Sequence, residues 1–300
     1  MRAQAATNQF KDWLLEIGSG TSDQPAGTPE ESVAIDKDIC LRESELDKLL
    51  DHTFGSTVVG NLGNSVASIL TTTNSDAFAI NDQVLAKMIN TINPPPPIKI
   101  YFSEDSMACG LAARSATNRN QIDDMVALAQ LENLHAQTPT GMPRHKLELA
   151  VGVPIVLLRN ICTMKGLCNG TRLIVQELKD HLIIAKIASG AYEGQSVMIH
   201  RMALTTSVGP DNQMELKRLQ FPVRLAFAMT INKAQGQTFD RVGLYLRSPV
   251  FAHGQLYVAL SRVRQMNHIR VLIRETPEQG FLPDGTGFTK NIVFREVFRP

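Results

Sequence analysis

Hydrophobic positions along the chain first repeat at helical spacing and then at strand spacing. Residues 9–20 (QFKDWLLEIGSG) place apolar side chains on one helical face and predict a helix that stops at Gly18. Residues 66–88 predict a short strand through Leu70, a polar turn and a helix, and residues 98–102 predict a further strand. A strand that enters a helix through a short turn is the elementary unit of α/β folds.

The pattern changes after residue 145 and then changes back. From Leu147 to Leu204, short β-type runs are separated by glycine turns, which predicts a small antiparallel barrel. The chain then alternates again: a strand at 224–230, a short helix or turn closed by Gly236, and a strand, a helix and a strand between 241 and 273. We therefore expect one α/β domain with an all-β barrel inserted into it.

These patterns predict five divisions of the chain. They are the first part of the α/β domain at 1–103, a variable insertion and linker at 104–144, the inserted barrel at 145–215, the remainder of the α/β domain at 216–275, and a C-terminal tail at 276–300. Within the variable insertion, a helix is predicted near Ile122 to Leu134.

Charge is balanced overall but not locally. The chain has 30 basic and 29 acidic side chains, a net charge of +1. Residues 1–55 carry a balance of −6, from 5 basic and 11 acidic side chains, whereas residues 215–274 carry +8, from 10 and 2. The second block has the charge to neutralise a phosphate backbone. A solvated basic face is the alternative interpretation.

Cysteine content and hydropathy indicate in which cellular compartment we expect the protein. Four cysteines are too few for a disulfide scaffold in a chain of 300 residues, which suits a reducing compartment. Cys162 and Cys168 have no further cysteine or histidine close by, so we expect no metal site in this chain. The N-terminal segment lacks the apolar core of a secretory signal, and no apolar run is long enough to span a bilayer. We expect an intracellular protein without membrane contact.

Two C-terminal segments carry candidate chemistry. Residues 228–239 (AMTINKAQGQTF) follow an apolar run and place polar side chains in a turn at Gly236, where a backbone without Cβ can pass close to a ligand. Free amides beside Lys233 suit an anion, although a hydrogen-bonded turn without a ligand is the alternative. Arg262 stands on a predicted helix, from which a guanidinium can present a planar fork to phosphate. A solvated surface arginine is the other interpretation of this residue.

Together these segments are more specific than either alone. Residues 221–246 (FPVRLAFAMTINKAQGQTFDRVGLYL) and 254–264 (GQLYVALSRVR) closely resemble the last two motifs of the PIF family of superfamily-one DNA helicases, especially the Helitron-transposon forms. Residues 70–85 (LTTTNSDAFAINDQVL) resemble the strand and helix that open the second half of that motor. Residues 138–175 resemble its inserted Src-homology-three-like barrel, and the initial MRA matches the end of its fourth motif.

The resemblance implies both a fold and a function. The fold is a RecA-like second motor domain of the P-loop NTPase type, an α/β fold with a parallel sheet and flanking helices, interrupted by the small barrel. The implied function is ATP-dependent DNA unwinding with ATP and Mg²⁺ as cofactors and single-stranded DNA as partner. Roles in DNA repair, recombination and telomere maintenance, in the nucleus or in mitochondria, follow from the same resemblance.

The resemblance also assigns roles to individual residues. It makes Arg262 the arginine finger on the γ-phosphate and Arg2 a second phosphate contact. The residues that would link the ATP pocket to the DNA groove are Gln235, Gly236 and Gln237. The residues that would face DNA are Thr72, Thr73, Asn74, Thr230, Asn232 and Lys233.

Catalysis in such motors needs parts that we do not find in this sequence. The chain has no GxxxxGK followed by Ser or Thr, and no apolar strand that ends in paired acids; IDD at 122–124 lies in a polar, helical setting. We therefore expect the C-terminal half of a helicase, which needs an N-terminal RecA-like domain and does not hydrolyse ATP alone. The alternatives are a non-enzymatic DNA-binding or protein-interaction module and a truncated transposon relic.

Overall fold

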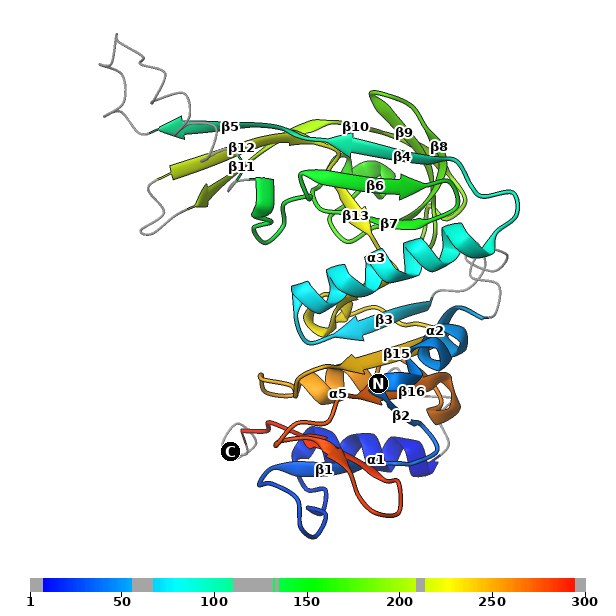
Figure 1. Ribbon diagram of the computed structural model, residues 1–300, viewed down its shortest axis with the longest axis vertical. Helices are drawn as coiled ribbons and strands as arrows, with labels where there is room; N and C mark the ends of the chain where they lie inside the picture. Colours follow the sequence, from blue (N-terminus) through cyan, green and yellow to red (C-terminus); the bar gives the residue numbers. More distant parts are fainter. Residues whose placement is uncertain (1–7, 56–66, 110–131, 133–134, 209–213, 295–300) are drawn as a thin grey trace. The chain divides into compact units, whose positions relative to one another are not determined.

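The described residues form two compact units. The computed structural model describes residues 8–55, 67–109, 132, 135–208 and 214–294 (Figure 1). One unit combines the chain up to Ile92 with the chain from Ala226 onward, and we call it the parallel-sheet unit. The other comprises Asn93–Leu225, and we call it the inserted unit. The predicted insertion and barrel ranges, 104–144 and 145–215, both lie within the inserted unit.

A parallel sheet organises the first unit. Its strand order is β14-β3-β15-β16-β2, and every neighbouring pair is parallel (Figure 1). The strands are β2 (Cys40–Arg42), β3 (Ala67–Thr71), β14 (Ala228–Thr230), β15 (Arg241–Leu246) and β16 (Ile269–Ile273). Parallel strands need long crossover connections, and here the whole inserted unit lies in the chain between β3 and β14. The predicted α/β class with a parallel sheet is confirmed.

Helices pack on both faces of this sheet. They are α1 (Asn8–Ser19), α2 (Leu46–Phe54), α3 (Asn74–Thr91) and α5 (Gln255–Leu260), with short 3₁₀ helices at Glu43–Glu45, Ile231–Ala234 and Met266–His268. Val242 and Leu244 of β15 share a core cluster with apolar residues of α1 and α5. Gly243 faces the other side, where an added Cβ would come within 2.6 Å of Thr53 Oγ1 on α2. Side chains alternate along a strand, so β15 contacts helices on both faces.

Strand β3 enters helix α3 through a short capped turn. The helix begins at Asn74, so the polar turn predicted after Leu70 is reduced to the residues between Thr71 and Asn74. Thr73 accepts a hydrogen bond from the Asp76 backbone N–H at 3.2 Å and donates one to the Asp76 carboxylate at 2.6 Å. This N-cap satisfies one of the backbone donors that a helix start leaves without an intrahelical partner.

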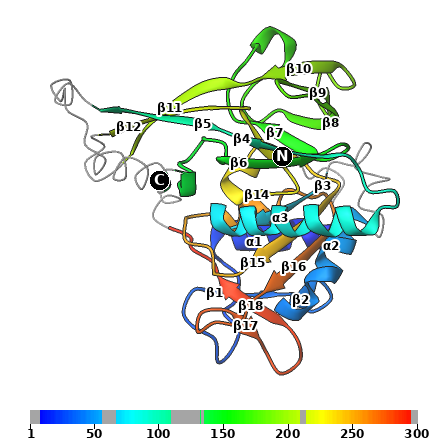
Figure 2. The ribbon, with the colours of Figure 1, turned by 45° about the horizontal axis from the view of Figure 1, so that its top comes forward.

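Residues after 275 pack onto the parallel-sheet unit. Strands β1 (Ser32–Ile35), β17 (Gly280–Phe281) and β18 (Gly287–Lys290) form an antiparallel sheet in the order β1-β18-β17 (Figure 2). The buried Asn291 donates from Nδ2 to the Ile17 carbonyl of α1 at 2.8 Å. The segment predicted as a C-terminal tail is therefore built into the same unit as α1 as far as it is described.

The inserted unit consists of antiparallel sheets. Their strand orders are β10-β9-β8-β7-β13, β11-β12-β5 and β4-β6. The strands are β4 (Ile98–Phe102), β5 (Glu104–Cys109), β6 (Lys146–Ala150), β7 (Pro154–Leu157), β8 (Arg172–Leu178), β9 (Leu182–Ile187), β10 (Ser196–His200), β11 (Met202–Val208), β12 (Met214–Gln220) and β13 (Val223–Leu225), with a 3₁₀ helix at Thr163–Lys165. The predicted antiparallel strands are confirmed, whereas their closure into a Src-homology-three-like barrel remains a prediction.

Two predicted elements differ in the structure. The single strand predicted at 224–230 is divided into β13 and β14, which pair in different sheets and different units. The division follows because β13 pairs antiparallel with β7 whereas β14 pairs parallel with β3. The variable insertion begins with strand β5, which pairs with β12, and its predicted helix near Ile122 to Leu134 lies largely outside the described residues.

Two further expectations concern thiols and membranes. Cys40, Cys162 and Cys168 are free thiols. Burial raises the pKa of the Cys40 thiol to about 12, so this thiol is protonated at neutral pH. Within the described ranges, none of the helices combines the length and the apolar character that crossing a bilayer requires.

Asn81 completes the outer edge of the parallel sheet. Strand β14 lies at that edge, so one side of its backbone has no strand partner among the described residues. The buried Asn81 of α3 accepts from the Ala228 backbone N–H at 2.9 Å and donates to the Ala228 carbonyl at 3.0 Å. Its amide therefore acts as one further strand residue and satisfies two buried backbone groups.

We expect Asn81→Ala to lower the free energy of unfolding by about 2–3 kcal/mol, because it leaves the N–H and C=O of Ala228 buried without these partners. The fluorescence of Trp13, the single tryptophan of the chain, follows urea unfolding of this unit. The exposed Gln83 on the same helix is the matched control, and Gln83→Ala should change stability by less than about 0.5 kcal/mol. Equal effects of the two substitutions would contradict this account of Asn81.

Candidate functional site

Two predicted site segments meet at one edge of the parallel sheet. Strands β3 and β14 are parallel neighbours, with Thr71 opposite Thr230. The residues that follow each strand, 72–74 and 231–233, therefore leave the sheet side by side. Lys233 Nζ donates to Asn74 Oδ1 at 3.3 Å across this edge. In open α/β sheets ligands bind outside the carboxyl ends of the strands, which is where these residues lie.

The predicted DNA-facing residues differ in accessibility. Thr72 and Thr230 are buried, and Thr72 Oγ1 lies 3.3 Å from Ser248 Oγ. Thr73 caps helix α3, so these three threonines have structural roles. Asn74 is half-buried, whereas the side chains of Asn232 and Lys233 are exposed. The exposed and half-buried members, which we call the polar edge, are accessible from solvent: Asn74, Asn232 and Lys233.

The loop after the 3₁₀ helix is built around Gly236. This glycine has φ +86°, a left-handed conformation that side chains disfavour, and an added Cβ would meet nothing within 4 Å. The backbone conformation, rather than lack of space, therefore requires glycine here. Gln237 holds the loop closed, since its Nε2 donates to the Lys233 carbonyl at 3.1 Å and its backbone N–H donates to the Ala234 carbonyl at 3.0 Å.

Arg262 joins this loop to helix α5, although it does not lie on the helix as predicted. The helix ends at Leu260, and Arg262 lies in the turn that follows. Its Nε donates to the Val258 carbonyl at 2.6 Å, and its Nη1 donates to the Gln237 carbonyl at 3.0 Å. Basic side chains near a helix C-terminus commonly bond the last free carbonyls. The turn lets the guanidinium fold back onto Val258 while it reaches the loop.

A cavity opens beside Arg262. It has a volume of about 350 Å³ and lies between α1, the Gly236 loop and the end of α5. Its lining residues are Lys11, Leu14, Leu15, Gly236, Thr238, Tyr257, Ser261, Arg262, Val263 and Arg264. Lys11, Arg262 and Arg264 supply three cationic groups, and no carboxylate is among the described residues that line it. A cavity of this charge and size suits an anionic small molecule.

The structure brings together some predicted residues and adds others. Gly236 and Arg262 line the cavity, whereas Gln235 and Gln237 belong to its loop without lining it. Arg2 lies outside the described residues. Lys11 and Thr238 join the cavity without having been predicted. Lys11 lies on the polar face of a predicted amphipathic helix, and the sequence pattern gives no sign of where that face points.

The predicted basic block does not form one surface. Arg218 is fully buried in the inserted unit, where its Nη2 pairs with Asp105 at 2.7 Å. In the parallel-sheet unit, Arg247 pairs with Asp76 at 3.4 Å and Arg274 with Glu43 at 3.5 Å. Three of the ten basic side chains of this block are therefore paired with carboxylates within the protein, whereas others, among them Lys217, Lys233, Arg241 and Arg264, are exposed.

Sequence comparisons find similarity to DNA helicases. The family model described as the 2B domain of the DNA helicase Pif1 matches residues 132–178, within the inserted unit. The human ATP-dependent DNA helicase PIF1 is 37% identical over 142 residues, which cover 46% of this chain and 21% of the human protein. The chain is related to the PIF1 family of DNA helicases. The rat PIF1 helicase is 36% identical over 142 residues and is likewise covered over only 21% of its length.

Solved PIF1 structures share the fold. The Pif1 helicase from Candida albicans has a TM-score of 0.55 at 20% identity, with 99% of this chain and 58% of that one covered. The Bacteroides Pif1 helicase in complex with ADP-AlF3 and single-stranded DNA has a TM-score of 0.52 at 23% identity, with 90% of this chain and 50% of that one covered. At these identities the likeness concerns the fold. The PIF1-related chain thus spans about half the length of the solved relatives.

We expect Arg262→Ala to open the loop that Arg262 holds. Loss of its charged hydrogen bonds, of about 1.5 kcal/mol or more, should raise the open population and hence the rate of trypsin cleavage after Lys233 about tenfold. Arg264→Ala is the matched control, because Arg264 is exposed and lines the same cavity. If both variants are cleaved at the wild-type rate, Arg262 does not hold the loop.

Proposed function

We propose that this chain supplies one wall of the nucleotide site and part of the DNA-binding edge of a PIF1-type ATP-dependent DNA helicase. The observation that carries the proposal is the cavity in which Arg262 meets the Gly236 loop among three cationic side chains. The polar edge lies at the start of the same loop, so a phosphate site and a nucleic-acid site would share one short segment of chain.

The cavity has the chemistry to hold phosphate groups. Lys11 and Arg264 are exposed cations, and Ser261 and Thr238 add hydroxyl donors. The Nε bond to Val258 fixes the side chain of Arg262, while its Nη2 contacts Ser261 Oγ at 2.8 Å. The two Nη groups can exchange these neutral acceptors for phosphate oxygens, which form stronger charge-assisted bonds. In phosphoryl transfer an arginine so placed is worth ~10³–10⁵ in rate.

A continuous set of hydrogen bonds connects the two sites. Arg262 Nη1 donates to the Gln237 carbonyl, and Gln237 Nε2 donates to the Lys233 carbonyl. Lys233 in turn contacts Asn74 at the polar edge. Movement of Arg262 toward a phosphate would release the Gln237 carbonyl and so alter the position of Lys233. This arrangement supports coupling between nucleotide and DNA through the loop.

The relatives support the same assignment. The curated relatives are ATP-dependent DNA helicases, and the Bacteroides relative is a complex with both ADP-AlF3 and single-stranded DNA. In this proposal the main triphosphate loop and the Mg²⁺ ligands belong to a partner RecA-like domain, because the sequence contains no GxxxxGK followed by Ser or Thr.

We expect the chain to bind inorganic tripolyphosphate without hydrolysing ATP. Lys11→Ala and Arg264→Ala should each weaken tripolyphosphate binding about tenfold, because each removes a charged donor from the cavity. Calorimetric titration measures the affinity. Lys48→Ala is the control, since Lys48 pairs with Glu45 and does not line the cavity.

Two results would contradict this assignment. One is tripolyphosphate binding that Lys48→Ala weakens as much as the cavity variants do. The other is DNA-stimulated ATP hydrolysis by the chain alone that Arg262→Ala abolishes, which would mean that no partner domain is needed.

We expect salt-sensitive binding of single-stranded oligothymidylate through the polar edge. Fluorescence anisotropy should show affinity falling as salt rises, and Lys233→Ala should reduce the slope of log affinity against log salt by about 0.7, the value for one phosphate contact to a single strand. Lys37→Ala removes an exposed lysine that is absent from the polar edge and should leave the slope unchanged. An unchanged slope for Lys233→Ala would exclude Lys233 as a phosphate contact.

A further inference from the structure

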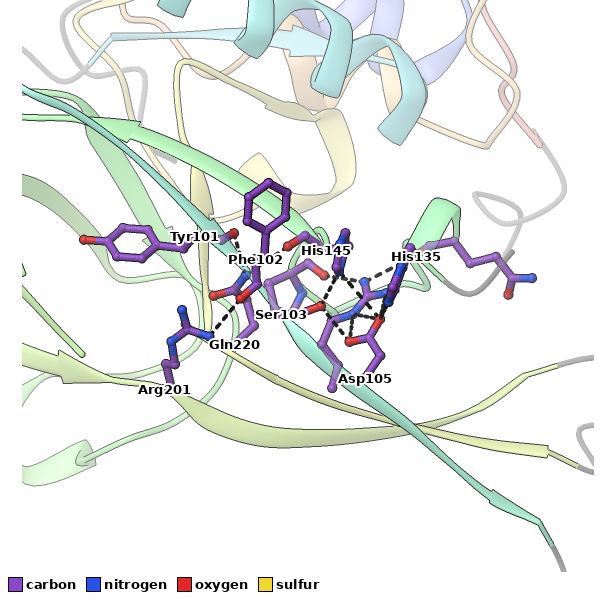
Figure 3. A network of polar contacts seen from close by, with 11 residues as sticks. Tyr101, Phe102, Ser103, Asp105, His135, His145, Arg201 and Gln220 are labelled. Carbon is purple, nitrogen blue, oxygen red and sulfur yellow. Dashed lines mark hydrogen bonds and ion pairs between the residues drawn. The ribbon is translucent and has the colours of Figure 1, made fainter. Parts of the chain in front are cut away.

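A cluster of two histidines and an aspartate lies in the inserted unit, whereas the cavity and the polar edge belong to the parallel-sheet unit (Figure 3). Asp105 belongs to β5, and His135 and His145 belong to the segment that leads into β6. One ligand atom from each residue lies within 4.8 Å of the others. His135 Nε2 is 3.7 Å from Asp105 Oδ2, and His145 Nδ1 is 4.0 Å from the same oxygen.

Arg218 holds all three residues in place. Its side chain is fully buried, and its Nε and Nη2 donate to the Asp105 carboxylate, at 2.9 Å to Oδ1 and 2.7 Å to Oδ2. Its Nη1 donates to the carbonyls of Gln137 and Pro143, at 3.2 and 2.9 Å. Gln137 follows His135 by two residues and Pro143 precedes His145 by two. One guanidinium therefore positions the carboxylate and both histidine-bearing segments.

The side chains around the cluster contact the carboxylate and the rings. Ser103 Oγ donates to Asp105 Oδ1 at 2.6 Å and contacts His145 Nδ1 at 2.8 Å (Figure 3). The two imidazoles stack with centroids 3.7 Å apart. Burial, together with the neighbouring His135 and Arg218, lowers the pKa of His145.

We propose that Asp105, His135 and His145 bind a divalent transition-metal ion of the zinc type, with one nitrogen from each ring and one carboxylate oxygen. Such an ion lies about 2.0–2.2 Å from nitrogen or oxygen ligands, so tetrahedral ligand atoms are about 3.4 Å apart. The observed separations of 3.7 and 4.0 Å must contract, and His145 Nδ1 must exchange its 2.8 Å contact with Ser103 Oγ for the ion. The stacked rings must also turn out of their parallel arrangement, and His135, whose side chain is 34% exposed, has room to do so.

The neighbouring groups determine which ion fits. Arg218 neutralises much of the Asp105 charge, so the two imidazoles supply most of the affinity. Imidazole ligands favour zinc and similar ions, whereas Mg²⁺ and Ca²⁺ need more anionic oxygens. The fourth position would be taken by water, because the His135 side of the cluster is partly exposed. Hydrogen bonds from Arg218 and Ser103 to the carboxylate are the outer contacts that orient ligands in metal sites.

This site differs from the sequence-based expectation of no metal ligands in the chain. Zinc motifs are recognised by close ligand spacing, such as pairs separated by two to four residues. Here the ligands lie 30 and 10 residues apart along the chain and are brought together by the pairing of β5 with β12 and by Arg218. The pattern of residues alone therefore gives no sign of the cluster.

Metal binding by the untagged, chelator-treated full chain tests this proposal. We expect one equivalent of Zn²⁺ in competition with a chromophoric chelator, and visible absorption bands of a tetrahedral site with Co²⁺. His135→Ala and His145→Ala should each weaken binding at least about tenfold, the loss that even an outer-shell partner can cause. His200→Ala is the matched control, because His200 is exposed on β10 of the same unit.

A second measurement separates metal binding from folding. Zn²⁺ should raise the thermal unfolding midpoint of the wild type and of His200→Ala but not of His135→Ala, since only a ligand bound to the folded state stabilises it. His135→Ala should otherwise unfold at a temperature near that of the metal-free wild type. The proposal is wrong if Zn²⁺ does not bind, or if the histidine variants bind it as well as the wild type does.

Discussion

The parallel pairing of β14 with β3 is the constraint on which the site depends. These strands are separated in the chain by the whole inserted unit, yet their register places Thr230 opposite Thr71. From that register it follows that the segments after both strands leave at the same edge, where Lys233 meets Asn74. Because β14 is an edge strand, the two bonds from Asn81 to Ala228 complete its pairing. The pairing of these two strands thus positions Lys233 and Asn74, which lie beyond the ends of the strands.

Some polar residues near this edge stabilise the fold, whereas others are accessible to a ligand. Thr72, Thr73 and Thr230 are committed to burial or to capping. Arg262 combines both roles. Its Nε bond fixes the side chain, and its two Nη groups donate to the Gln237 carbonyl and to Ser261 Oγ, acceptors that phosphate oxygens could replace. The exposed cations around the cavity have no such structural commitment among the described contacts, and a group of like positive charges attracts anions.

Local sequence patterns predicted much of the fold. Helix α1, the β3–α3 unit and strands β4, β15 and β16 have strong periodicity and clear turn residues, so local signals and tertiary packing agree. Tertiary contacts decided the remaining features. The division of 224–230 into β13 and β14 depends on partners from two sheets. The end of α5 before Arg262 depends on carbonyls in a distant loop.

The same distinction applies to charge. Arg218 belongs to a basic run in the sequence, but its partner Asp105 lies 113 residues earlier in the chain. Burial alone raises the pKa of the Asp105 carboxyl, yet hydrogen bonds from Arg218 and Ser103 outweigh this effect and hold the pKa below its usual value. A count of charges along the chain cannot separate such a buried pair from an accessible cation. The motif resemblance made Arg262 a candidate site residue in advance. The places of Lys11 and of the histidine cluster follow only from the three-dimensional structure.

We propose that phosphate and single-stranded DNA occupy adjacent sites joined by the Gly236 loop. Hydrogen–deuterium exchange of the chain with tripolyphosphate and with oligothymidylate, each added alone, tests it most directly. We expect tripolyphosphate to protect amides in 236–239 and 261–264, and oligothymidylate to protect amides in 72–76 and 231–235. The proposal is contradicted if neither ligand protects the segments named for it, or if both ligands protect one and the same segment outside these four.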